Sequence, residues 1–146
     1  MRRFFILLFF FTSLLIHNAY AEILSDVKIY GNKRISKETI MIFGNIKLND
    51  DINTADLDDI LKKLYQTNFF SDVRLNFNNN ILEINLTENA IIQNVVFNGV
   101  KAKKVKEKLK EVIELKDKSS FVEHKAKNDL NQIKNILQAM GYYFAE

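Results

Sequence analysis

The strongest constraint in this sequence is an internal repeat, because two similar stretches must adopt the same order of secondary structure. The segment VKIYGNKRISKETI from Val27 resembles VVFNGVKAKKVKEKL from Val95. Each places a glycine, Gly31 or Gly99, between a β-like pattern and a helical one. Further along, LYQTNFFSDV resembles LQAMGYYFAE. We therefore expect two copies of one unit, residues 22–89 and 90–146, with the second copy incomplete.

The strands of the first copy are predicted by alternating apolar residues. This alternation covers residues 23–29, 71–77 and 82–86, and it predicts strands with one buried and one solvated face. Gly31 and Asn32 predict a turn after the first strand, as Gly99 does in the second copy. The asparagines at 78–80 predict a hairpin between the last two strands.

Two helices are expected between the first and second strands. Ser36 is the predicted N-cap of the first helix, and Thr54 or Asp56 that of the second. The second helix carries one apolar stripe, formed by Leu57, Ile60, Leu61 and Leu64. The unit is therefore expected to be an α+β domain of order β-α-α-β-β, a three-stranded mixed sheet covered on one face by two helices.

Connectivity restricts the order of these strands. The crossover through two helices suits a parallel pairing of the first strand, whereas the last two strands form a hairpin. If the last strand lies in the centre, the order is first, third, second, and residues 71–77 form an edge. An order with the second strand in the centre remains open on the sequence alone.

The first 21 residues have the features of a cleaved signal peptide. Two arginines precede the apolar run from Phe4 to Ile16, and Ala19 and Ala21 form an A-x-A cleavage pattern. The apolar run is shorter than the roughly 20 residues of a spanning helix. An uncleaved N-terminal anchor is the alternative interpretation.

The composition of residues 22–146 excludes several classes of function. There is no cysteine, which excludes thiol catalysis and cysteine metal sites. Residues 22–89 carry 8 basic and 11 acidic side chains, and residues 90–146 carry 11 basic and 7 acidic ones. The lysines of KAKKVKEKLK are not accompanied by aromatic or arginine side chains that could contact bases. A solvated helix face is therefore favoured over nucleic-acid binding. With His124 the only histidine after residue 21, neither an enzyme nor a metal site is expected.

Three local patterns have simpler structural interpretations. The aspartates of LNDDINTADLDD lack the glycine and closing glutamate of a calcium loop, so helix capping is favoured. Arg34 in GNKRI is expected at the surface, and no glycine-rich phosphate loop surrounds it. Tyr142, Tyr143 and Phe144 are expected in the core.

The pattern VKIYGNKRI, the LYQTNFFSDVRL step and the doubled β-α-α-β-β unit resemble polypeptide-transport-associated (POTRA) domains. A signal peptide followed at once by tandem copies is similar to the BamA family of outer-membrane protein assembly factors. The family often has a proline between repeats, and this chain has none. Family members continue into further copies and a C-terminal membrane β-barrel, so the 146 residues are interpreted as a fragment of a longer protein.

The resemblance implies a non-enzymatic role at the periplasmic face of the outer membrane, without a cofactor. The implied partners are unfolded outer-membrane proteins, a periplasmic chaperone, accessory lipoproteins and the membrane itself through the barrel. An exposed strand edge binds extended peptides with little regard to sequence. The candidate binding strand consists of Ser71, Asp72, Val73, Arg74, Leu75, Asn76 and Phe77.

Three alternatives stay open at this point. A two-partner secretion transporter would carry the same modules with another cargo, and a cell-division scaffold would carry one such domain behind a membrane anchor. The strand at 71–77 could also be scaffold only, with partners docking on the helices.

Overall fold

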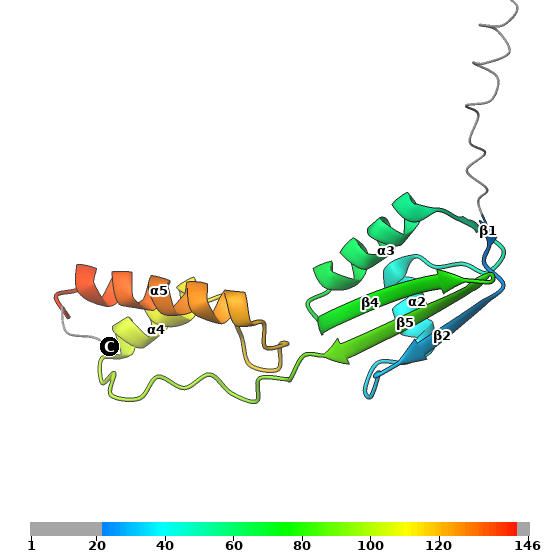
Figure 1. Cartoon of the computed structure of the whole chain (residues 1–146). Helices are drawn as coiled ribbons and strands as arrows, with labels where there is room; N and C mark the ends of the chain where they lie inside the picture. Colours follow the sequence, from blue (N-terminus) through cyan, green and yellow to red (C-terminus); the bar gives the residue numbers. More distant parts are fainter. Residues whose placement is uncertain (1–21, 143–146) are drawn as a thin grey trace, which may run out of the picture.

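The computed structural model describes residues 22–142, in which a β-sheet unit is followed by a pair of helices (Figure 1). The signal peptide, Tyr143 and Phe144 lie outside the described residues. The prediction that Tyr142 lies in the core was wrong, because this residue is exposed. The first unit contains β1 (Glu22–Ile23), β2 (Asp26–Tyr30), α2 (Lys37–Gly44), β3 (Asp51–Ile52), α3 (Thr54–Gln66), β4 (Phe70–Asn78) and β5 (Ile81–Glu88). The second contains α4 (Lys103–Val112) and α5 (Glu123–Ala139).

The three long strands form a mixed sheet in the order β2-β5-β4. Strand β2 is parallel to β5, with Asp26 opposite Ile81, and β4 is antiparallel to β5, with Val73 opposite Leu86. The order first, third, second is therefore confirmed, and β4 is an edge strand of this sheet. Asn79 and Asn80 form the two-residue hairpin loop, and both have positive φ, as a type I′ turn requires.

The predicted first strand differs from the observed one. Residues 23–29 do not form one strand, because the chain leaves the extended run at Leu24 and Ser25. Leu24 is fully buried and exchanges backbone hydrogen bonds with Asn49 and Asp50, and the backbone N–H of Ser25 donates to the Asn80 carbonyl. The short pair β1–β3 results, which alternation alone does not indicate.

The helix caps are partly as expected. Ser36 caps α2, and its hydroxyl accepts the Thr39 N–H at 3.2 Å. The predicted cap of α3 was wrong, because Asn53 is the N-cap. Its side chain accepts the Asp56 N–H, and the Asp56 carboxylate accepts the Asn53 N–H. Asp56 thus closes a capping box from the third helical position.

Both helices pack on one face of the sheet (Figure 1). The core joins buried side chains of the two helices to those of all three strands. It includes Ile40, Ile60, Leu64, Val27, Val73, Leu82, Ile84 and Leu86. Exposed Lys28, Arg74, Asn76 and Asn85 lie on the opposite face, which confirms the single covered face.

The second unit repeats the local geometry of the first. The bridge between Ile91 and Ser120 corresponds to the β1–β3 pair, and Ile92 exchanges hydrogen bonds with Lys118 and Ser119 as Leu24 does with its partners. Positive φ recurs at the equivalent positions Gly31 and Gly99, Asn49 and Lys118, and Asn68 and Gly141. The short bridge and the turns of the first unit therefore recur in the backbone of the second.

The β-like pattern VVFNG of the second copy is not a strand within residues 22–142. In the first unit β2 pairs with β5, the last strand of that unit. The described part of the second unit has no counterpart of β5, so residues 95–98 have no neighbouring strand. A Cβ at Gly99 would meet nothing within 4 Å, whereas one at Gly31 would lie 2.0 Å from the Leu86 carbonyl oxygen.

We expect Ile84→Ala to lower the free energy of unfolding by about 2–5 kcal/mol, because Ile84 is fully buried in the central strand. Leu75→Ala is expected to cost less than Ile84→Ala, because Leu75 is only half-buried. Urea unfolding of the chain measures both, with the exposed Ile42→Ala as control. Equal effects of Ile84→Ala and Ile42→Ala would contradict this assignment of the core.

Candidate functional site

The candidate site is the free edge of β4, on the side of the strand away from β5. In an antiparallel pair, each residue directs both its N–H and its C=O either toward the neighbouring strand or away from it. The N–H of Val73 donates to the Tyr65 hydroxyl at 3.0 Å and therefore points away from β5. By alternation, the backbone groups of Leu75 and Phe77 point to the free edge as well.

The alternation of backbone directions also shows which residues of the predicted binding strand do not face the free edge. The backbone groups of Arg74 and Asn76 point to β5, opposite Asn85 and Glu83, so they are not available at the free edge. Their side chains are exposed on the outer face of the sheet. Ser71 lies in a register irregularity between Phe70 and Asp72, where its hydroxyl donates to the Thr87 carbonyl at 3.2 Å.

The side chains of β4 separate into an inner and an outer set. Val73 is buried, and Leu75 and Phe77 pack half-buried against the core. On the outer face, Arg74 forms an ion pair with Asp72 at 3.0 Å. At the free edge, the outward N–H and C=O groups of β4 therefore lie between two surfaces. One is the polar outer face of the sheet, and the other is the apolar face that the helices cover.

The opposite edge, formed by β2, is covered by side chains at Val27. The N–H of Val27 donates to the Asp26 carboxylate at 2.7 Å, and the Val27 carbonyl accepts from the Lys37 ammonium. Asp26 and Lys37 also form an ion pair at 3.7 Å. Side chains that cover backbone groups in this way make an edge less receptive to a further strand. Strand β2 is also shorter, with five residues against nine in β4.

The turn after β2 is held to the end of β5 by Glu88. One oxygen of its carboxylate accepts the backbone N–H groups of Lys33, Arg34 and Ile35 at 2.7–3.1 Å. The other oxygen pairs with the Arg34 guanidinium at 3.0 Å, and that guanidinium also donates to the Asn89 carbonyl. Arg34 is exposed as expected, yet it has a structural role.

Gly31 and Asn32 complete this turn. The positive φ of Gly31, +88°, and its contact with the Leu86 carbonyl leave no room for a side chain. The Asn32 side chain donates to the Ile35 carbonyl at 3.0 Å. The GNKRI turn, residues 31–35, therefore connects β2 to α2 and is bound to Glu88 at the end of β5. We call these contacts the Glu88 clamp, and they lie apart from the free edge of β4.

The pKa of Glu88 reflects this clamp. Burial raises the pKa of the carboxyl, but the N–H groups of Lys33, Arg34 and Ile35 and the charge of Arg34 lower it. The net result is a pKa below the ordinary value of a glutamate. Folding therefore favours the ionised form, and this stabilisation is lost as the pH falls through the folded-state pKa.

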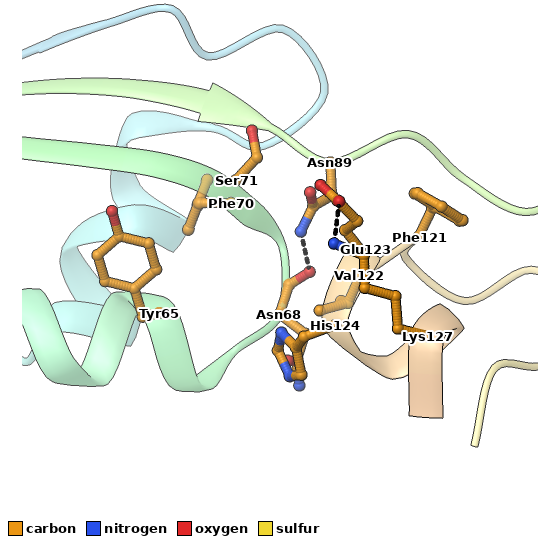
Figure 2. A pocket seen from close by; sticks show the side chains of 10 residues that line it. All are labelled: Tyr65, Asn68, Phe70, Ser71, Asn89, Phe121, Val122, Glu123, His124 and Lys127. Carbon is orange, nitrogen blue, oxygen red and sulfur yellow. Dashed lines mark hydrogen bonds and ion pairs between the residues drawn. The ribbon is translucent and has the colours of Figure 1, made fainter. Parts of the chain in front are cut away.

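A cleft of about 620 Å³ lies where β4 begins, between α3 and the start of α5 (Figure 2). Tyr65, Asn68, Phe70 and Ser71 line it from the first unit, and Phe121 and His124 are among the residues that line it from the second. An Asn89 side-chain hydrogen bond to the Asn68 carbonyl, 2.9 Å long, lies at the base of the connection between the units. The exposed aromatic ring of Phe121 gives the cleft apolar surface.

Charged groups at the rim of this cleft are already paired. The Lys127 ammonium lies 2.7 Å from the Glu123 carboxylate (Figure 2). The hydrogen bond from Lys127 holds the pKa of Glu123 below its ordinary value. The cleft is thus not a strongly charged binding pocket.

No group of three or more potential metal ligands occurs among residues 22–142, the part of the chain that the structure describes. The aspartates of LNDDINTADLDD serve other roles. Asp56 belongs to the capping box of α3, and Asp59 pairs with Lys63 at 2.6 Å. Within the same described range, no helix is long and apolar enough to cross a membrane.

Tyr65 and Glu88 were missed by sequence reasoning. Tyr65 follows the buried Leu64 and lies outside the apolar stripe of α3, so periodicity gives it no role. Glu88 ends a strand with alternating polarity and reads as a solvent-facing residue. A tyrosine near the end of a helix that leads directly into a strand can place its hydroxyl beside the backbone of that strand. This weak signal is the one that could have indicated a contact between Tyr65 and β4.

Comparisons with known proteins agree with this fold. Residues 90–146 match the family model described as POTRA, surface antigen variable number repeat. The outer membrane protein assembly factor BamA of Neorickettsia risticii (strain Illinois) is 28% identical over 116 residues, which is 80% of this chain and 16% of that protein. BamA of Buchnera aphidicola subsp. Acyrthosiphon pisum (strain APS) is 28% identical over 98 residues, or 67% of this chain and 16% of that protein. The chain thus spans about one sixth of the length of these curated relatives.

Solved structures share the fold at low sequence identity. The N-terminal domain of Omp85 from Thermosynechococcus elongatus superposes with a TM-score of 0.54 at 13% identity, over 83% of this chain and 53% of that one. The structure of POTRA1-2 of the periplasmic domain of Omp85 from Anabaena gives 0.51 at 10% identity, over 87% of this chain and 84% of that one.

We expect Glu88→Gln to lower the free energy of unfolding by about 1–3 kcal/mol at pH 7, because charge-assisted hydrogen bonds to three backbone N–H groups are weakened. The loss should shrink as the pH falls through the lowered pKa of Glu88, since the wild-type carboxylate is then protonated as well. Urea unfolding between pH 7 and pH 3 measures this difference. Glu83→Gln on the same strand is the control, and a pH-independent loss for Glu88→Gln would contradict the clamp.

Proposed function

Since the chain has the POTRA fold of Omp85 and BamA proteins, we propose that it is the periplasmic POTRA region of an outer-membrane β-barrel protein assembly factor. In this proposal residues 1–21 direct export, and residues 22–89 and 90–146 are the first and second POTRA domains. The free edge of β4 binds unfolded outer-membrane proteins by strand addition. The role is that of a non-enzymatic binding module.

The observation that carries this proposal is the difference between the two edges of the sheet. At Val27 on β2, side chains occupy both the N–H and the C=O that face outward. On β4, the Tyr65 hydroxyl holds the N–H of Val73, and the outward groups of Leu75 and Phe77 follow in a row. Since β4 has nine residues against five in β2, it offers an extended peptide the longer row of hydrogen-bonding groups.

The energetics suit transient binding. Each added backbone hydrogen bond contributes about 0.5–1.5 kcal/mol net, and a few such bonds are opposed by the cost of ordering the peptide. Backbone pairing also reads little sequence, because every residue except proline offers the same groups. Such an edge holds many different unfolded chains briefly and releases them to the next step of assembly.

The partners in this proposal are those that the resemblance to BamA proteins implies. Unfolded barrel proteins occupy the edge, a periplasmic chaperone delivers them, and accessory lipoproteins of an assembly complex contact other surfaces. A barrel that follows the POTRA domains anchors the protein in the outer membrane. The names of the BamA relatives support assembly as the process.

Disulfide capture tests the edge directly, because the chain has no cysteine of its own. We expect Asn76→Cys, on the outer face of β4, to capture by thiol–disulfide exchange a ten-residue peptide of alternating valine and threonine. The peptide's one central cysteine is supplied as a mixed disulfide with a small thiol, which leaves when the new disulfide forms. Facing residues of paired strands bring their Cβ atoms to about 4.5–5.5 Å, which is close enough for exchange with little adjustment. Quantitative mass spectrometry of the adduct measures capture.

Two matched variants locate the binding surface. Lys28→Cys places the thiol on the protected edge strand β2, and Lys62→Cys places it on the exposed side of α3. Both are expected to capture at least about tenfold less peptide than Asn76→Cys, as is Asn76→Cys with a peptide that carries alternating prolines. Preferred capture at Lys62→Cys would show helix docking and contradict the proposal.

A further inference from the structure

The side chain of Tyr65 contacts the free edge of β4 at Val73. Tyr65 lies near the end of α3, and the residue is 41% exposed, so it lies at the surface rather than within the core. Its hydroxyl accepts the N–H of Val73 at 3.0 Å. The contact joins a helix side chain to a backbone group that an added strand would otherwise use.

The hydrogen bond divides the edge at one residue. Toward the hairpin, the outward groups of Leu75 and Phe77 continue without such a side chain among the hydrogen bonds of the described residues. Toward the start of β4, Tyr65 and Ser71 both line the cleft between the units (Figure 2). The edge and the cleft therefore meet at the Tyr65 ring.

We propose that Tyr65 is a gate that sets the register of a strand docked on β4. With the hydroxyl on Val73, the docked strand pairs from the hairpin end up to Leu75 and stops. When the ring turns away, the ladder extends to Val73 and the strand continues into the cleft. This inference rests on the proposed function of the β4 edge.

The physical basis is competition for one donor. The Tyr65 hydroxyl and a carbonyl of the docked strand cannot both accept the Val73 N–H in good geometry. Without the hydroxyl, the N–H is free for the strand, and one further hydrogen bond should tighten binding about two- to tenfold. The cleft of about 620 Å³ provides the space for the extended strand.

The test uses Tyr65→Phe, which removes the hydroxyl, and Tyr65→Ala, which also removes the ring. The same valine–threonine peptide, labelled for fluorescence anisotropy, measures the Kd. A second readout follows the register, because Asp72→Cys lies beside Val73 and Asn76→Cys lies nearer the hairpin. Tyr30→Ala, at the end of β2 and similarly exposed, is the matched control, and urea unfolding checks that each variant is folded.

With peptide in large excess over its Kd, the expected result is increased capture at Asp72→Cys and unchanged capture at Asn76→Cys. The Kd itself is expected to fall about two- to tenfold in at least one Tyr65 variant. Capture at Asn76→Cys with no change of Kd or of Asp72→Cys capture in either variant would overturn the gate alone. Absence of capture at both cysteines in the wild-type background would overturn docking on β4, and with it the proposed function.

Discussion

Both outer strands of the first unit depend on pairing with β5. Strands β2 and β4 do not pair with each other, and each receives its ladder hydrogen bonds from the central strand. The Glu88 clamp fastens the end of β5 to the turn that leads into α2. The helices cover a face that exists only once these three strands are together. The unit is therefore organised around the strand that comes last in its sequence.

The same dependence explains the difference between the two copies. Residues 95–98 repeat the sequence pattern of β2, and Gly99 repeats the positive φ of Gly31. The short bridge at Ile91 and the two helices also have counterparts in the first unit. What the described second copy lacks is a neighbour for its first strand. Local sequence is sufficient for the turns and helices, whereas the sheet requires a partner distant in sequence.

Most of the fold could be predicted from the sequence, because its signals are local. Alternation predicted β4 and β5, the asparagine run predicted the hairpin, and Ser36 was correctly identified as a cap. The strand order followed from connectivity once the last strand was placed in the centre.

The errors arose where tertiary contacts decide. The break at Leu24 depends on hydrogen bonds to Asn49 and Asp50, in the loop that follows α2. The cap of α3 could not be chosen from the sequence, because the loop before this helix contains several polar residues that are all suitable N-caps, and the structure uses Asn53. The contact from Tyr65 to Val73 joins a helix to a strand edge, and no periodicity encodes it. The candidate site could therefore be assigned to a strand from the sequence, but not to individual backbone groups.

The late position of β5 also has a kinetic consequence. Asp26 pairs with Ile81, so a long loop must close before the parallel ladder gains any hydrogen bond. Topologies dominated by such distant contacts fold slowly compared with helical bundles of similar size. A chain that emerges from its N-terminus onward cannot complete this sheet until residue 88 is available. The three-stranded sheet therefore forms only after nearly the whole unit has been synthesised, whereas its helices and turns depend on local sequence.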